Sequence, residues 1–129
     1  MAAFLSDAWM SDYVTAMADL PQLDGCDAVI QYVVSGAPDG KVNFFEVIES
    51  GQTTEVTAGK RKDADITITW KYAEAVAEHD GERSVEVAYM AARSKIEGDA
   101  RRYLIDLLPM RRTEQYRSAR AHLAETTEF

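Results

Sequence analysis

The order of apolar and polar residues divides the chain into helical and extended segments. Residues 4–20 repeat apolar side chains at helical spacing, with Ser6 as the N-cap residue, and predict an amphipathic helix that Pro21 ends. Four later runs are rich in β-branched and aromatic residues and are separated by turn residues, so they predict strands at 28–35, 41–49, 53–58 and 64–70. The third of these runs is polar, which is typical of an edge strand.

The last of these runs alternates, so that Ile66, Ile68 and Trp70 face one way. After it the spacing becomes helical. Ser84 is expected to cap a second short helix, and Pro109 to kink or break the C-terminal one. We therefore read residues 1–129 as one domain: an N-terminal helix and loop (1–27), four strands (28–70), two short helices (71–92), a fifth strand (93–98) and a C-terminal helical segment (99–129).

Because the strands come mostly in one run, this order predicts an α+β fold with a five-stranded, mostly antiparallel sheet. The fifth strand returns to the sheet after a helical crossover, which favours at least one parallel pair in the sheet. The polar helix after Pro109 is expected to fold back over the domain.

The composition agrees with a folded, acidic domain. Hydrophobic residues make up 47% and charged residues 28% of the chain, a globular profile. The formal net charge of −8 disfavours nucleic acid and stable insertion into or docking on an anionic membrane. Cys26 is the single cysteine and cannot form an internal disulfide, and we expect neither a signal peptide nor a spanning helix. These features favour a cytoplasmic protein.

The residues that could carry chemistry do not form a known catalytic or metal-binding pattern. His79 and His122 lie outside any ligand spacing, and the glycines occur singly at turns. The arginine pairs at 101–102 and 111–112 are expected on solvated faces, with a docking patch for an acidic head group as the lesser alternative. We therefore predict no catalytic residue, no metal and no cofactor, and favour a protein that is not an enzyme.

The apolar residues between positions 66 and 110 leave two interpretations open. Several aromatic or flexible side chains are expected on one side of short helices, where they either fill the core or line a cavity. Composition and spacing alone favour the core. These side chains are Trp70, Tyr72, Tyr89, Met90, Tyr103 and Met110.

Two stretches resemble the sterol carrier protein 2 (SCP2) family. Residues 64–70 (ADITITW) resemble its A-D-x-T-[IVL]-T segment. Residues 88–99 are similar to its block A-[FLY]-M-x-G-[KR]-[LIV]-K-[IVL]-x-G-[DN], and the spacing between the two stretches also fits. The glycine before the basic residue of that block is absent, and Ala91-Ala92-Arg93 stands there. The resemblance covers about residues 28–128.

The resemblance implies a sheet covered on one face by helices, with an apolar tunnel between them. It further implies binding and transfer of a sterol, fatty acid, acyl-CoA or phospholipid without covalent change. The residues that the resemblance places along the tunnel are Ile66, Ile68, Trp70, Val76, Tyr89, Met90, Ile96, Tyr103, Leu104, Leu107 and Leu108.

Two other functions stay open at this point. A small-pocket enzyme, such as an isomerase or cyclase acting on a hydrophobic metabolite in a bacterial pathway, would use the same tunnel with one tyrosine as the acid. A partner module would instead dock its acidic surface on another protein. An edge strand and a C-terminal helix also leave a homodimer open.

Overall fold

The helices and strands of the computed structural model, which describes residues 1–82 and 84–129, largely follow the predicted order. Their bounds are β1 (Ala2–Ala3), α1 (Asp7–Met17), β2 (Ala28–Ala37), β3 (Gly40–Glu49), β4 (Gln52–Ala58), β5 (Ile66–Lys71), α2 (Tyr72–His79), α3 (Val85–Met90), β6 (Ser94–Gly98), the π-helical turn η1 (Arg102–Asp106), α4 (Leu108–Arg111), α5 (Glu114–Glu125) and β7 (Thr127–Glu128).

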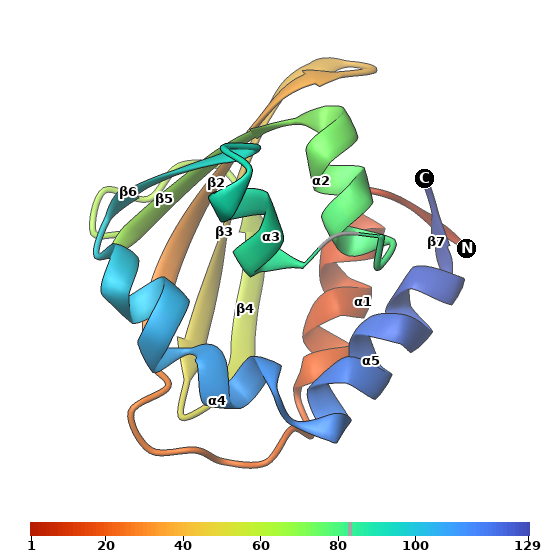
Figure 1. Ribbon diagram of the computed structural model, residues 1–129. Helices are drawn as coiled ribbons and strands as arrows, with labels where there is room; N and C mark the ends of the chain where they lie inside the picture. The colour runs from red at the N-terminus through yellow and green to blue at the C-terminus, as the bar shows by residue number, and fades with distance from the viewer. Residues whose placement is uncertain (83) are drawn as a thin grey trace.

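The central sheet has five strands in the order β4-β3-β2-β5-β6, and all neighbours are antiparallel except β2 and β5 (Figure 1). This confirms the α+β class, the mostly antiparallel sheet and the edge position of the polar third run, β4. The predicted parallel pair is present and joins β2 to β5. The last sheet strand, β6, is antiparallel to β5, because the chain crosses from β4 to the free edge of β2 before β5 begins.

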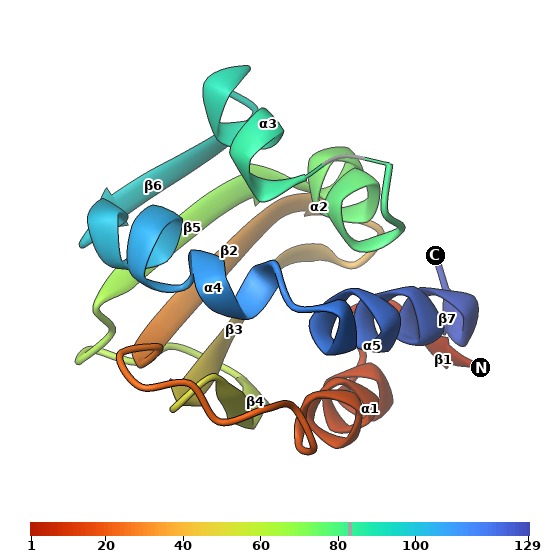
Figure 2. The same cartoon turned by 60° about the horizontal axis from the view of Figure 1, so that its bottom comes forward.

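The helices α1, α2, α4 and α5 lie on one side of the sheet (Figures 1 and 2). The inward-facing positions of the two central strands are apolar or aromatic. Ile30 and Tyr32 on β2 pair with Ile66 and Ile68 on β5, and all four are buried. Thr67 lies between the two isoleucines and points to the opposite face, so the predicted alternation of this strand is confirmed.

Two predicted helix starts are also confirmed by their caps. The Ser6 hydroxyl accepts a hydrogen bond from the Trp9 backbone N–H at 3.2 Å, and the Ser84 hydroxyl accepts one from Val87 at 3.2 Å. Pro109 lies in the first turn of α4, where its missing N–H removes no helical hydrogen bond. The C-terminal segment is therefore broken before Pro109, as predicted.

The helix α3 ends in a Schellman motif centred on Ala92. The Arg93 N–H donates to the Ala88 carbonyl at 2.8 Å, and the Ala92 N–H donates to the Tyr89 carbonyl at 3.0 Å. Ala92 has φ +56°, the left-handed conformation that favours glycine. It stands where the SCP2 pattern has its glycine, so this chain keeps the backbone turn while placing a side chain on it.

The two ends of the chain form a second, small sheet that the sequence did not predict. β1 pairs in parallel with β7, with Ala2 opposite Thr127. Phe4 follows β1 and packs its ring 5.1 Å from that of Phe129 and 5.2 Å from that of His79. Because residues 2–3 are extended, the first helix begins at Asp7 rather than at residue 4.

Candidate functional site

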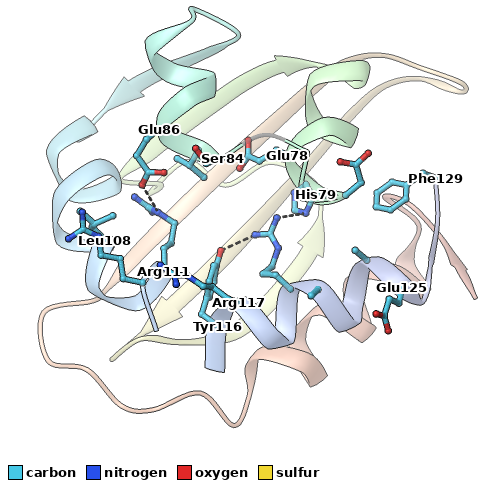
Figure 3. Close-up of a pocket in the computed structure, with 17 residues that line it drawn as sticks. Glu78, His79, Ser84, Glu86, Leu108, Arg111, Tyr116, Arg117, Glu125 and Phe129 are labelled. Atoms are coloured by element: carbon cyan, nitrogen blue, oxygen red, sulfur yellow. Dashed lines mark hydrogen bonds and ion pairs between the residues drawn. The ribbon is translucent and has the colours of Figure 1, made fainter. Parts of the chain in front are cut away.

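A groove of about 960 Å³ opens between α2 and α3 on one side and α4 and α5 on the other (Figure 3). We call this space the groove. Its lining combines apolar side chains from several elements with charged ones. The apolar lining residues are Val85, Leu108, Ala121, Ala124 and Phe129, and the charged ones are Glu78, Asp80, Glu86, Arg111, Arg112, Arg117, Arg120 and Glu125.

A small chamber lies deeper, between the helices and the inner face of the sheet. Side chains of β2 and β3 contribute to its lining and leave about 30 Å³ free. The chamber adjoins the groove, because six residues line both: Glu78, His79, Val85, Arg111, Tyr116 and Arg120. A molecule in the groove would therefore meet these six residues before it reached the sheet.

Arg120 is at the centre of this junction. Its guanidinium donates one hydrogen bond to the Tyr116 hydroxyl at 2.8 Å and a second to Nδ1 of His79 at 3.0 Å (Figure 3). It also lies 5.8 Å from the centre of the Tyr13 ring. Burial, together with the nearby charge of Arg120, holds the pKa of His79 well below its usual range. His79 is therefore neutral, with Nδ1 as an acceptor.

Glu78 precedes His79 on α2 and carries a perturbed carboxyl group. Burial raises its pKa to about 7, against the opposing attraction of Arg120 and Arg111. The carboxyl group is therefore close to half-ionised at neutral pH. An acid with such a pKa next to a groove is able to exchange protons with a ligand.

Arg111 is held from two sides. Its Nη2 donates to the Tyr103 carbonyl at 2.7 Å, and its Nε lies 3.4 Å from a Glu86 carboxylate oxygen. The guanidinium carbon lies 5.0 Å from the centre of the Tyr103 ring, and the side chain is only 11% exposed. The prediction that this arginine belongs to a solvated face is therefore wrong. It lies in the last turn of α4, where the Tyr103 carbonyl and the Glu86 carboxylate hold its guanidinium away from solvent.

Glu46 is a buried carboxylate on β3, 3% exposed, at the wall of the chamber. It accepts hydrogen bonds from the Tyr32 hydroxyl at 2.9 Å and the Thr53 hydroxyl at 2.7 Å. Burial raises its pKa, and these two hydrogen bonds oppose the rise. The inner face of the sheet therefore carries one satisfied acidic group among apolar side chains.

The structure brings three of the predicted tunnel residues to these spaces. Tyr103 and Leu107 line the chamber, and Leu108 lines the groove. Six others belong to the hydrophobic core or pack against it: Ile66, Ile68, Trp70, Val76, Ile96 and Leu104.

The remaining two predicted residues lie on the surface of α3. Tyr89 is 41% exposed and Met90 is 83% exposed, and neither lines the groove or the chamber. Their role in a ligand tunnel stays a prediction.

Sequence reasoning did not select the charged residues of this site, although two of them carry a signal. Glu46 shares the inward phase of β3 with Phe44 and Ile48, so its position predicts burial. Arg120 stands four residues after Tyr116 and three before Leu123, on the one apolar stripe of an otherwise polar helix. A charged residue on an apolar stripe indicates a buried polar site.

Two negative findings apply to the part of the chain that the structure describes. Residues 1–82 and 84–129 contain no group of three or more His, Cys, Asp or Glu side chains arranged to hold a metal ion. Within the same residues, no helix is long and apolar enough to cross a membrane.

Comparison with known proteins gives no match by sequence and several by structure. The chain matches no protein-family model and no curated protein sequence. A conserved hypothetical protein of Thermus thermophilus, suggested to be a sterol carrier protein, is 12% identical with a TM-score of 0.73, over 95% of this chain and 91% of that one. A crystal structure of sterol carrier protein 2 is 14% identical with a TM-score of 0.68, over 94% and 96% of the two chains.

A third similar structure is the palmitated SCP2L2 of Aedes aegypti. It is 15% identical with a TM-score of 0.62, over 85% of this chain and 95% of that one. At these identities the likeness establishes the fold, and it confirms the helix-covered five-stranded sheet that the resemblance implied. The chain has the SCP2 fold.

Proposed function

We propose that this chain, which has the SCP2 fold, binds a lipid or other hydrophobic small molecule and carries it without covalent change. The observation that carries the proposal is the groove of about 960 Å³ that adjoins the chamber at the sheet. This volume is at the upper end of the range for small-molecule sites. Val85, Leu108 and Phe129 offer the groove's larger apolar contacts.

The driving force would be removal of the ligand's apolar surface from water. Each methylene buried contributes about 0.8 kcal/mol, so a long alkyl chain is enough to hold a ligand against the cost of association. Tyr103 and Leu107 line the chamber and would contact the deep end of the ligand. Ile66, Ile68 and Trp70 are buried on the same face of the sheet. We propose that they would also contact the ligand if the chamber widened.

Native mass spectrometry after incubation with sterols, fatty acids, acyl-CoAs and phospholipids tests this proposal. We expect adducts that survive buffer exchange. Leu108→Glu places a charge in the groove and should remove them, whereas Ile105→Glu is the matched control, since Ile105 is 56% exposed and lines neither space. Circular dichroism would establish that both variants fold. The absence of any adduct with the unmodified chain would contradict the proposal.

A second function, a small-pocket isomerase or cyclase, is favoured by one observation. Glu78 has a pKa of about 7 and lines both the groove and the chamber, which suits a general acid or base at neutral pH. In this case the ligand recovered after incubation would differ chemically from the ligand added. Glu78→Gln would stop the conversion while adduct formation continued. Recovery of every ligand unchanged would rule the second function out for that panel.

A further inference from the structure

The charge of Arg120 is not balanced by a carboxylate in contact with it. In the described part of the chain, its guanidinium hydrogen-bonds to a tyrosine hydroxyl and to a neutral histidine. Among residues 1–82 and 84–129, no carboxylate oxygen lies within 4 Å of its guanidinium. A partly buried cation loses hydration, and that loss is normally offset by an anion in direct contact.

The guanidinium has donors left for such an anion. Arginine carries five N–H donors in a planar fork, of which Tyr116 and His79 take two. The other three have no acceptor among the residues that the structure describes, and they belong to a side chain that lines both the groove and the chamber. Glu78 and Glu46 influence this arginine only at longer range. The position next to Arg120 is therefore suited to an acceptor group on a ligand.

We propose that Arg120 binds the acidic head group of the ligand, which is consequently a carboxylate attached to an apolar tail and not a neutral sterol or alcohol. This inference rests on the proposed function. A carboxylate matches the guanidinium fork and accepts two parallel hydrogen bonds from it. The hydroxyl of a sterol would accept one hydrogen bond and leave the positive charge unbalanced.

The charged residues around the groove favour a ligand head group with one negative charge over a head group with two. Arg111, Arg112, Arg117 and Arg120 are matched there by Glu78, Asp80, Glu86 and Glu125. The lining therefore has no excess of positive charge with which to neutralise a dianion. Arg112 and Arg117 are exposed to solvent and Arg111 lies beside Glu86, so Arg120 is the half-buried charge that a single carboxylate would balance. The tail would then lie along Val85 and Leu108.

The test compares palmitate with hexadecanol, which has the same number of carbon atoms and no charge, by calorimetric titration at neutral pH below the micellar concentration. We expect palmitate to bind at least about tenfold more tightly, the range for a hydrogen bond to a charged group. Arg120→Gln should abolish this preference by weakening palmitate alone. Lys62→Gln removes the same charge from an exposed position that lines neither the groove nor the chamber, and it should keep the preference.

The outcomes separate this inference from the proposed function. If both lipids bind the unmodified chain equally, or if the preference survives in Arg120→Gln, the head-group assignment is wrong while lipid binding stands. If neither lipid binds, the proposed function fails and the head-group assignment fails with it. Should Arg120→Gln not fold, Arg120→Lys decides, since it keeps the charge and loses the fork. A reduced palmitate preference supports the assignment, and an unchanged one overturns it.

Discussion

Replacing Glu78 by Gln should stabilise the protein at neutral pH and leave its stability unchanged in acid. Burial raises the pKa of Glu78 to about 7 in the folded chain, from a reference value of 4.5. Folding therefore favours the protonated carboxyl group, and glutamine imitates that form in size and charge. The substitution removes an ionisation that the folded state resists.

The direction follows from counting bound protons. Between about pH 4.5 and 7 the unfolded chain releases the Glu78 proton while the folded chain keeps it, so stability falls as pH rises and levels off above about 7. The difference between about 7 and 4.5, at about 1.36 kcal/mol per pKa unit, gives an upper limit of about 3 kcal/mol. Glu78→Gln should therefore be more stable by up to about 3 kcal/mol above pH 7.

Urea unfolding followed by tryptophan fluorescence, repeated across this pH range, measures the effect. Other titrating groups are common to both proteins and cancel in the difference between them. Glu125→Gln, an exposed carboxylate at the same groove, controls for the loss of one negative charge. A stability difference between Glu78→Gln and the unmodified chain that is the same in acid and above pH 7 would refute the reasoning.

Three further substitutions test the backbone and the buried carboxylate by chemical denaturation. Gly98→Ala should destabilise the fold by more than about 2 kcal/mol, because φ is +87° and a Cβ would lie 2.5 Å from the Asp65 carbonyl oxygen. Ala92→Gly should stabilise it by up to about 1 kcal/mol, since φ is +56° there. Tyr32→Phe should cost about 1–3 kcal/mol by leaving a Glu46 oxygen without its donor, and less when Glu46 is already glutamine. Equal costs in the two backgrounds would contradict the last expectation.

The sheet could be predicted from the sequence because each of its strands carries a local pattern. Two patterns predict which segments are extended and which face is buried: the alternation of Ile66, Ile68 and Trp70, and the run of apolar residues after position 28. The helix starts at Ser6 and Ser84 could be predicted for the same reason, since an N-cap depends only on residues within one helical turn. The strand patterns and the helix caps therefore do not depend on residues that are distant in the sequence.

Features that depend on remote partners were not predictable in the same way. The pairing of β1 with β7 joins Ala2–Ala3 to Thr127–Glu128, and neither dipeptide has a strand pattern. The position of the parallel pair depended on how the chain crossed the sheet after β4. The tunnel residues that the resemblance implied are apolar or aromatic, so they leave out the charged groups Glu46, Glu78 and Arg120 that line the chamber.

The free energy that the fold spends on burying Glu78 and Arg120 is itself an argument for a ligand. Glu78 resists ionisation where it lies, and Arg120 keeps its charge with only neutral groups in hydrogen-bonding contact. Apolar residues of similar size would pack this junction without either cost. A carboxylate between the groove and the chamber would balance Arg120 and would be accepted most readily while Glu78 is protonated. The complex would thus offset the charge of Arg120, and the resistance of Glu78 to ionisation would limit its repulsion of the ligand. This is the pattern expected when stability is exchanged for recognition at a binding site.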